Sequence, residues 1–395
     1  MNPQAKPLSD FASNRYLSYP HTNGFADGGA SLVVGQIEEK TVSLWKRHLA
    51  SGKEVRLGVF PVTKAPPNKL IWFDVAFDVN RLVAVVDQSV WLIDLTRLDA
   101  PRKIYQPPAT HSLNCLPSIT ADGRQLLMML NREEKIYHAV HMDLESGAER
   151  VLFEHTWFAN HLHFSPADPH WIGYCHEGAT GKIPDRIWAW HAEKAPQGRC
   201  LFDQRSDHPP LKLCVGHERW SFHTPSTVVV AYGVSPAGPR GLYEVFADDR
   251  PARLISPGER DYHCDVSRDG RWAVVDTTGP HDAPGCGWEN ALDICDILIV
   301  DMKTGRREFL ARSRQYKFHP RHPHPVFSPD GSTIFYNEAE SGGDHNRIME
   351  VLNPWKVGSC RSTARQEPGF RVQGSGPGKQ LSDCEGVVHP SDSAS

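Results

Sequence analysis

The sequence predicts an all-β protein built as a seven-bladed β-propeller. One unit, a turn followed by a strand of β-branched and aromatic residues, recurs seven times along the chain, and no long amphipathic helix interrupts it. A run of histidines and prolines at residues 319–325 adds a second expectation. Because neutral imidazole is the commonest side-chain ligand of divalent transition metals, this run predicts a metal site in the central channel.

The bulk composition excludes several classes of partner. The chain has 395 residues and a formal net charge of −4, so it offers no strongly basic surface for nucleic acid or anionic lipid. It contains no apolar stretch of signal-peptide or membrane-spanning length. Nine cysteines without a C-x-x-C pair suit a reducing compartment. We therefore expect a cytoplasmic protein with neither nucleic-acid nor membrane partners.

The repeated unit is clearest where a Ser-Pro-Asp-Gly type of turn precedes the strand. The three clearest copies are Ser328–Tyr336, Ser267–Val275 and Thr120–Met128. Four weaker copies begin at Phe25, Phe77, Ser165 and His223. The period of about 43 to 61 residues leaves room for four short antiparallel strands in each unit, which is typical of propeller blades.

The two ends of the chain complete this prediction. The last unit has three strands at most, ending near Leu352, so the ring is expected to close with a strand from residues before Tyr19. Residues 1–355 are expected to form the propeller as a single domain. Residues 356–395 are rich in Gly, Ser, Pro and charge, and are expected to be a disordered tail.

Histidines occupy one register position in five of the seven units. Each lies four residues before a turn, and the five are His21, His161, His217, His263 and His324. The strand that leads into this turn is the innermost strand of a blade, so these side chains are expected to converge on the axis. For His21 and His161 the alternative is a polar channel residue that hydrogen-bonds water.

The run at residues 319–325 is expected to be an extended ribbon, because each proline disfavours helix in the residue before it. His322 and His324 then point to the same side, and His319 joins them only if the ribbon bends near Pro320. His263 lies one repeat earlier and can face them across a blade boundary. Four imidazoles suit Mn, Fe, Co, Ni or Zn rather than Ca or Mg. The alternative is a polar surface loop.

Several motifs resemble those of the oligogalacturonate lyases, polysaccharide lyases built on a seven-bladed propeller. The resemblance covers roughly residues 150 to 340, and its motifs are Gly173-Tyr-Cys-His-Glu-Gly, Asp185-Arg-Ile-Trp, Gly216-His-Glu-Arg-Trp, Tyr262-His-Cys-Asp-Val-Ser and His322-Pro-His-Pro-Val-Phe. The resemblance implies a manganese ion held by His263, His322 and His324. His319 stands where the family has a glutamine, a departure that bears on the identity of the metal.

The resemblance also implies the chemistry, which is β-elimination in a short uronate oligosaccharide. It implies that His217 takes the proton next to the carboxylate and that Arg186 binds the charge that develops there. A loop with His176 and Glu177 is expected at the channel mouth, where these residues and His161 bind sugar; the alternative for the loop pair is a capping role.

Two other functions remain open from the sequence. A noncatalytic TolB-like propeller would explain the turns but not the histidine cluster. A metal-dependent hydrolase would need a carboxylate base, and Glu218 is adjacent to His217 but is expected to face the opposite way in a regular strand. Ultraviolet absorbance of an unsaturated uronate product distinguishes elimination from both alternatives.

Overall fold

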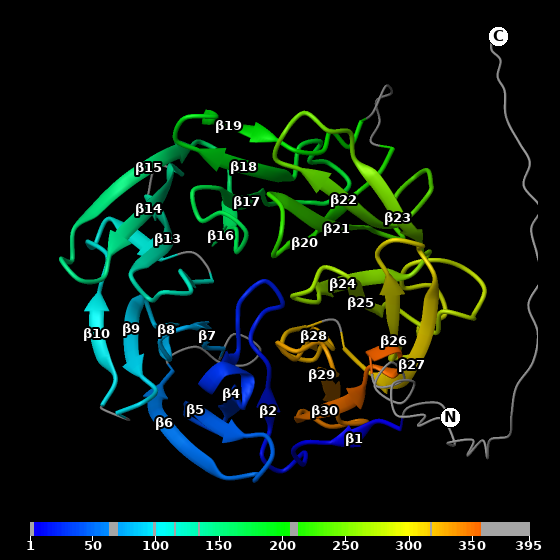
Figure 1. The fold of residues 1–395 in the computed structure, drawn as a ribbon, viewed down its shortest axis with the longest axis horizontal. Helices are drawn as coiled ribbons and strands as arrows, with labels where there is room; N and C mark the ends of the chain where they lie inside the picture. Colours follow the sequence, from blue (N-terminus) through cyan, green and yellow to red (C-terminus); the bar gives the residue numbers. More distant parts are fainter. Residues whose placement is uncertain are drawn as a thin grey trace, which may run out of the picture.

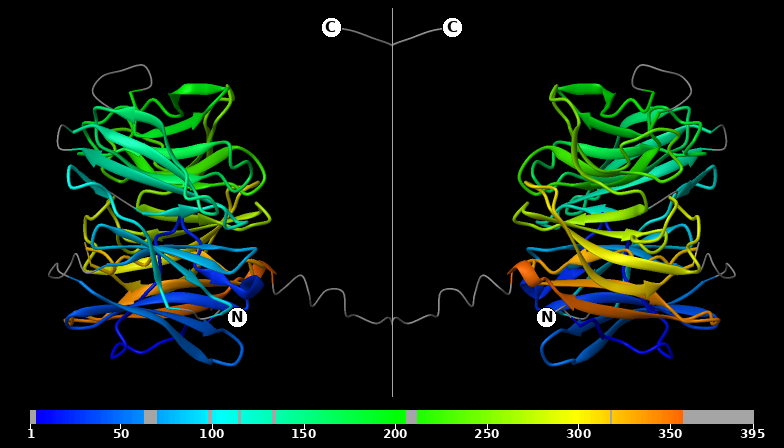
Figure 2. Two further views of the ribbon diagram at one scale, coloured as in Figure 1. Left: turned by 90° about the vertical axis from the view of Figure 1, so that its left-hand side faces the viewer. Right: turned by 90° about the vertical axis from the view of Figure 1, so that its right-hand side faces the viewer.

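Seven β-sheets surround a central axis and confirm the predicted seven-bladed propeller (Figure 1). The computed structural model describes residues 4–62, 70–97, 100–113, 116–132, 135–205, 212–316 and 318–356. Seen edge-on, the ring is thinner along its axis than it is wide (Figure 2). The tail that the sequence predicts to be disordered lies, apart from Lys356, outside the described residues.

The blades are numbered here in chain order. Blade 1 contains β2 (Arg15–Tyr16), β3 (Phe25–Ala26), the 3-10 helix η1 (Asp27–Gly29), β4 (Ser31–Ile37), β5 (Thr41–His48) and β6 (Glu54–Pro61). Blade 2 contains β7 (Trp72–Ala76), β8 (Arg81–Val86), β9 (Ser89–Asp94) and β10 (Arg102–Tyr105). Blade 3 contains β11 (His111–Leu113), β12 (Ser118–Ile119), β13 (Gln125–Arg132), β14 (Tyr137–Asp143) and β15 (Glu149–His155).

The remaining blades follow the same antiparallel order. Blade 4 contains β16 (Ala159–Phe164), β17 (Ile172–His176), β18 (Ile187–His191) and β19 (Ala195–Cys200). Blade 5 contains β20 (Val215–Trp220), β21 (Ser226–Ala231), β22 (Gly241–Phe246) and β23 (Arg253–Pro257). Blade 6 contains β24 (Asp261–Val266), β25 (Trp272–Thr277), β26 (Ile294–Asp301) and β27 (Arg307–Arg314). Blade 7 contains β28 (Val326–Phe327), β29 (Thr333–Ala339), β30 (Asn346–Leu352) and β1 (Lys6–Pro7).

The ring closes as the sequence predicts, with an N-terminal strand in the last blade. Lys6 pairs with Glu350 and Pro7 pairs with Met349, so β1 is the outermost strand of blade 7. The pairing satisfies backbone groups of β30 that would otherwise form an exposed sheet edge. Both ends of the described chain are thereby joined in one sheet.

The middle strands of the blades are buried on both faces, because each sheet packs against the sheets of its neighbours. Every residue of β21 and of β25 is buried. Strands of this kind read as continuous apolar runs rather than as alternating patterns. The outer strand β15, by contrast, has four exposed residues. The core is therefore a series of apolar layers between blades rather than one central core.

The repeated turns have a common construction. Asp330 accepts hydrogen bonds from the Ser328 hydroxyl and the Ser332 amide at 2.6 and 3.0 Å, and Gly331 adopts a φ of 70°. An L side chain is strained at this φ, which explains the glycine. Asp269 accepts the same pair of bonds in blade 6. The turn motif is thus a local structural device, and it carries no information about function.

A loop at residues 17–24 reaches into the middle of the ring between β2 and β3, where it is drawn in blue (Figure 1). The Leu17 amide donates to Asn337 Oδ1 at 2.9 Å, and the Ser18 hydroxyl donates to the Phe73 carbonyl at 2.5 Å. These bonds hold the loop to blades 7 and 2, so its side chains are fixed inside the channel. Across the described residues, no helix has the length and apolarity to cross a membrane.

Candidate metal centre and cavity

Three of the four predicted metal ligands come together in the channel. His263 lies on β24, and His322 and His324 lie in the segment just before β28. One ligand nitrogen from each lies within 4.8 Å of those of the other two, and all three residues are buried. The ring centroid of His263 is 5.1 Å from that of His322 and 4.4 Å from that of His324. The boundary between blades 6 and 7 therefore holds a compact imidazole group.

The segment that carries these histidines differs from the extended ribbon that the sequence predicts. The Arg321 amide donates to the Phe318 carbonyl at 2.9 Å, so residues 318–321 form a turn. His324 has a φ of 47°, in the left-handed region. The prediction of an uninterrupted ribbon was wrong because tertiary hydrogen bonds override the local preference: Asn337 Nδ2 donates to the carbonyl of His322 at 3.2 Å.

His319 lies beside this group rather than within it. Its ring centroid is 4.6 Å from His322 and 4.8 Å from His324 but 6.5 Å from His263. The turn at residues 318–321 sets this position, and the ring also packs edge-on against Trp72. Among the described residues, Nδ1 of His319 is also buried without a hydrogen-bond partner, so a role for His319 as a fourth ligand stays a prediction, and its ring lies farther from His263 than from the other two.

The buried carboxylate of Asp276 orients His263 and His324 through hydrogen bonds. Asp276 accepts hydrogen bonds from the backbone amide and Nδ1 of His263 at 2.7 and 2.8 Å, and from the His324 amide at 3.2 Å. Nδ1 of His263 is then the donor, which leaves the lone pair on Nε2. A carboxylate behind an imidazole is the usual outer partner of a metal-binding histidine.

The sequence analysis did not predict Asp276 as a site residue. The available signal was a single acidic residue inside the apolar strand β25, where a charge is costly unless it has a specific partner. Burial raises the pKa of the Asp276 carboxyl, the amides of His263 and His324 act in the opposite direction, and a cation on His263 would favour the ionised carboxylate.

These residues fit a divalent transition metal. Within the described ranges, His263 Nε2 and both ring nitrogens of His324 are buried and have no hydrogen-bond partner. Burial, followed by the neighbouring histidines, lowers the pKa of both imidazoles well below the usual value, so both are neutral and offer lone pairs. Three imidazoles suit Mn, Fe, Co, Ni or Zn better than the oxygen-seeking ions Ca and Mg.

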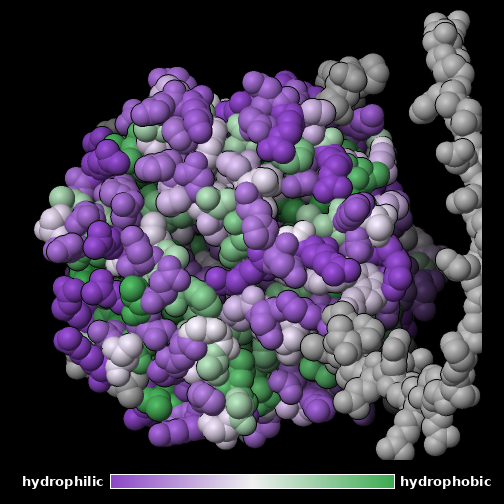
Figure 3. All heavy atoms as spheres, in the orientation of Figure 1, coloured by the Kyte–Doolittle hydropathy of each residue, from purple (hydrophilic) through white to green (hydrophobic). Residues whose placement is uncertain are grey.

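A cavity of about 380 Å³ lies next to the imidazole group. Of the predicted site residues, it is lined by His161, Glu177, Arg186, His217 and His319. Its wall also includes three tyrosines that sequence reasoning missed, Tyr19, Tyr232 and Tyr262. On the face of the ring seen in Figure 3, hydrophilic side chains predominate among the described residues. A cavity with this lining suits a polar ligand rather than an apolar one.

The inner strands of blades 4, 5 and 6 each contain a bulge at a channel histidine. In β20, Gly216 pairs with Val230 and Arg219 with Val228, so His217 and Glu218 together oppose one residue. The register shifts in the same way in β16 at His161 and in β24 at His263. A bulge re-aims side chains away from strict alternation.

Glu218 shows the effect of this bulge. It was expected to face the opposite way from His217, and it lies in a group with His21 and His163 rather than in the wall of the cavity. Its Oε1 lies 3.2 Å from Nδ1 of His161, a residue that lines the cavity. His217 has a φ of 53°, so adjacent residues no longer point to opposite faces of the sheet.

His217 is positioned to accept a proton. Its Nδ1 donates to the Tyr262 carbonyl, so the lone pair lies on Nε2. Its ring stacks on His263 with centroids 4.1 Å apart. Burial, only partly offset by the bond to Tyr262, lowers its pKa to about 3, so the imidazole is neutral near pH 7.

Arg186 is held rigidly at the wall of the cavity. Its Nε donates to the Val215 carbonyl at 3.0 Å, and Nη2 donates to both oxygens of Glu177 at 3.1 and 3.2 Å. Nη1 donates to the Gly178 carbonyl at 3.2 Å. Burial tends to raise the pKa of Glu177, but His161 and Arg186 outweigh it and lower that pKa. Glu177 is therefore ionised and fixes the guanidinium.

His176 does not line this cavity, contrary to expectation. Its Nδ1 interacts with Asp185 Oδ1 at 2.9 Å, and its ring stacks on Trp157 with centroids 4.2 Å apart. His176 ends β17 and Glu177 follows it directly, so the two side chains diverge. The structure supports Glu177, but not His176, as a residue of the cavity.

The motif glycines are explained by close packing, between blades 4 and 5 at Gly173 and within blade 5 at Gly216. A Cβ on Gly173 would lie 2.2 Å from Nε1 of Trp220, and a Cβ on Gly216 would lie 2.1 Å from the Tyr232 hydroxyl. The two motifs that begin at these glycines therefore interlock. Their packing sets the positions of the inner strands that carry His161 and His217.

Comparison with known proteins agrees with these observations. The chain is 24% identical over 217 residues to an oligogalacturonide lyase of Pectobacterium atrosepticum, which covers 51% of this chain and 52% of that protein. An oligogalacturonate lyase of Dickeya dadantii is 24% identical over 215 residues, with the same two shares. The chain thus spans about half the length of the curated relatives it matches. No protein-family model matches it.

Two solved structures share the whole fold. An oligogalacturonate lyase in complex with manganese has a TM-score of 0.73 and 19% identity, covering 90% of this chain and 94% of that chain. An oligogalacturonate lyase from Vibrio parahaemolyticus has a TM-score of 0.73 and 14% identity, covering 90% of this chain and 98% of that chain.

The fold and the channel define a seven-bladed β-propeller with a buried imidazole group beside a polar cavity. The resemblance that the motifs predict is confirmed. Over about half its length the chain is similar in sequence to an oligogalacturonide lyase and an oligogalacturonate lyase, and it shares its fold with an oligogalacturonate lyase.

Proposed function

We propose that this protein is a metal-dependent lyase that cleaves short uronate oligosaccharides by β-elimination. The curated relatives named oligogalacturonide and oligogalacturonate lyase support the reaction class and the kind of substrate. One structural observation carries the proposal: His263, His322 and His324 converge beside a cavity that also contains His217 and Arg186. The imidazole group supplies metal donors, and the adjacent cavity supplies a neutral base and a fixed cation.

The imidazoles would hold the metal ion, and Asp276 orients one of them. A divalent ion held by His263, His322 and His324 would supply positive charge to the carboxylate oxygens of a bound uronate, and manganese is the first candidate because the similar solved structure contains it. Asp276 keeps the His263 ring in the tautomer and orientation that this role requires.

His217 acts as the general base in this proposal. Nε2 takes the proton from the carbon next to the carboxylate, because Nδ1 is already committed to the Tyr262 carbonyl. The C–H electron pair forms the new C=C bond, and the bond to the glycosidic oxygen breaks with its electron pair on oxygen. That oxygen takes up a proton, so the products are an unsaturated uronate and a shortened chain.

Arg186 stabilises the negative charge that develops during proton removal. Its hydrogen bonds to Val215, Gly178 and Glu177 use most of its five N–H groups, which leaves a remaining Nη1 hydrogen for a substrate oxygen. Because these bonds hold the guanidinium in place, it needs no reorganisation when the charge appears. Glu177 and His161 complete this wall and are proposed to bind sugar hydroxyls.

The experiment is an ultraviolet assay of the manganese-loaded protein with di- and trigalacturonate. Elimination gives a conjugated product, so absorbance should rise together with new reducing ends. New reducing ends without absorbance would instead indicate a hydrolase, and no products would indicate a binding scaffold. Neutral oligogalactose is the matched control, because it lacks the carboxylate that both the elimination and Arg186 require.

A further inference from the structure

We propose that His21, His163 and Glu218 form a second divalent-metal site in the channel, separate from the His263 group. One ligand atom from each residue lies within 4.8 Å of the other two. His21 belongs to the loop at residues 17–24 of blade 1, His163 to β16 of blade 4 and Glu218 to β20 of blade 5. A bound ion would therefore join three segments that are far apart in the sequence.

The three side chains are buried and largely without partners. His21 is 6% exposed, His163 is 2% exposed and Glu218 is 3% exposed. Among the described residues, neither ring nitrogen of His21 has a hydrogen-bond partner, nor do Nε2 of His163 and Oε2 of Glu218. Buried polar atoms are costly when unsatisfied, so unsatisfied atoms on all three residues of one group indicate a missing partner.

The surrounding residues hold the donors in place for a ligand. Nδ1 of His163 donates to the His161 carbonyl at 2.5 Å, which leaves its lone pair on Nε2. Backbone carbonyls commonly fix metal-binding imidazoles in this way.

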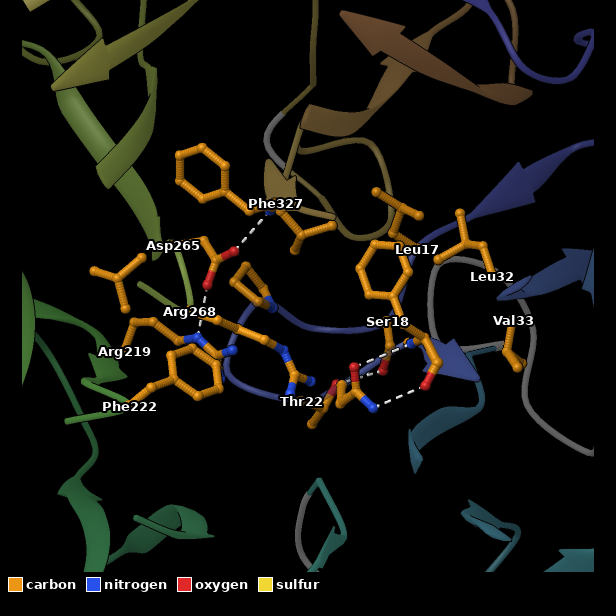
Figure 4. Close-up of a pocket in the computed structure, with 16 residues that line it drawn as sticks. Leu17, Ser18, Thr22, Leu32, Val33, Arg219, Phe222, Asp265, Arg268 and Phe327 are labelled. Atoms are coloured by element: carbon orange, nitrogen blue, oxygen red, sulfur yellow. Dashed lines mark hydrogen bonds and ion pairs between the residues drawn. The ribbon is translucent and has the colours of Figure 1, made fainter. Parts of the chain in front are cut away.

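The loop that carries His21 is fixed as well. The His21 carbonyl accepts from Arg219 Nη1 at 2.9 Å, and Arg219 Nε donates to Asp265 at 2.6 Å. Asp265 in turn accepts from the Phe327 amide at 2.8 Å (Figure 4). The three donor side chains are thus positioned before any ion binds.

Charge at this group favours a cation. Burial tends to raise the pKa of Glu218, but His161 and His163 outweigh it and hold that pKa at about 2, so the carboxylate is ionised. Burial, followed by other groups, lowers the pKa of His21 well below the usual value and that of His163 to about 4, so both rings are neutral. Two neutral imidazoles and one carboxylate form a ligand set typical of Zn²⁺ and related transition metals.

Tyr19 connects this group to the cavity. Its ring centroid is 4.8 Å from His21, 5.0 Å from His161 and 5.2 Å from His324, so it contacts members of both histidine groups. An ion bound by His21 would anchor the loop that carries Tyr19, and Tyr19 lines the cavity. The second ion therefore has a structural role beside the proposed reaction site.

The test counts metal ions in the full chain. Protein stripped with a chelator is loaded with Zn²⁺, freed of excess metal and analysed for zinc per chain. We expect two ions in the wild type, and one each in Glu218→Gln, His163→Gln and His324→Gln. His48→Gln, which removes an exposed histidine outside the channel, should retain two.

Two results would overturn the second site. One is a wild type that saturates with a single ion, which would indicate that water satisfies the buried donors. The other is a second ion that persists in both Glu218→Gln and His163→Gln. If these two variants do not fold, His324→Gln is the test, because it leaves the second group intact. It must then bind one ion, and a variant that binds none rejects the second site. Lyase activity with one ion per chain would uphold the proposed function and reject this site.

Discussion

At the scale of single residues, the proposed metal ligands and the proposed base are neighbours in the channel but have different surroundings. His217 stacks on His263, yet it lines the cavity and uses Nδ1 to bond a backbone carbonyl. Its remaining nitrogen, Nε2, has a fixed orientation beside the proposed metal ligands. The assignment of His217 as the base therefore rests on hydrogen bonding and position.

Replacing His217 with asparagine tests that assignment. We expect His217→Asn to lower kcat by at least about 10²-fold, the usual contribution of a general base, because the amide cannot accept the proton. Its metal content should remain that of the wild type, as measured by elemental analysis alongside the ultraviolet assay. Near-normal turnover would exclude His217 as the base, and lost metal would make it a ligand.

Asp276 is expected to control metal affinity without contacting the ion. We expect Asp276→Asn to weaken metal binding about 10- to 100-fold, because an amide has no charge and only one acceptor oxygen for the three N–H groups that Asp276 binds. Titration calorimetry with Mn²⁺ measures the change. Asp330→Asn, in a turn on the surface, is the control and should bind Mn²⁺ as the wild type does. Equal affinities for the two variants would contradict the role of Asp276.

His319 differs from the three clustered histidines, and the difference is measurable. We expect His319→Gln to change Mn²⁺ affinity by less than about tenfold, or 1.4 kcal/mol, because its ring lies 6.5 Å from that of His263. His324→Gln should lose binding at this group altogether. If the two variants lose affinity equally, His319 is a full ligand and the ring must move when the ion binds.

At the scale of single elements, the bulges in β16, β20 and β24 decide which side chains enter the channel. Each bulge lies in the inner strand of its blade and includes one channel histidine, namely His161, His217 or His263. A regular strand would direct only alternate residues inward. Because of the bulge, β20 supplies both His217 to the cavity and Glu218 to the group with His163.

Packing between blades 4 and 5 supports these bulges, and a substitution at Gly173 tests how much this packing contributes to stability. A Cβ at this position would lie 2.2 Å from Nε1 of the buried Trp220 and 3.1 Å from Cε1 of His163. We expect Gly173→Ala to lower the free energy of unfolding by about 1–3 kcal/mol through overpacking. Gly181→Ala is the matched control, because no atom lies within 4 Å of its added Cβ. Urea denaturation of both variants provides the comparison.

At the scale of the whole molecule, the site depends on closure of the ring. Blade 7 combines β28, β29 and β30 with the N-terminal strand β1, and Asn337 on β29 connects this blade to the loop at residues 17–24. The same side chain donates to the carbonyls of Pro320 and His322 at 3.3 and 3.2 Å. The buried side-chain amide of Asn337 therefore both holds the loop at residues 17–24 to blade 7 and fixes the position of His322.

Removing this amide should affect both stability and metal binding. We expect Asn337→Ala to cost about 1–3 kcal/mol in the free energy of unfolding, because buried backbone groups lose their partner. Mn²⁺ affinity should fall as well, since His322 is no longer held. Gln106→Ala, which removes an exposed amide, should change neither property. A stable variant that binds Mn²⁺ normally would show that Asn337 is dispensable.

The sequence by itself determined the number of blades, the closing strand and the register of the channel histidines. These features depend on local patterns: turns with Asp and Gly at fixed positions, apolar strands between them, and a histidine four residues before a turn. The tertiary structure decided which of those side chains meet. The turn at residues 318–321 displaces His319, the bulge in β20 brings Glu218 into the channel, and Asp276 pairs with His263. The Asp276 pair and the bulge in β20 depend on hydrogen bonds between paired strands, and the segment after the turn is held by the bond from Asn337 to His322; spacing along a sequence does not encode such bonds.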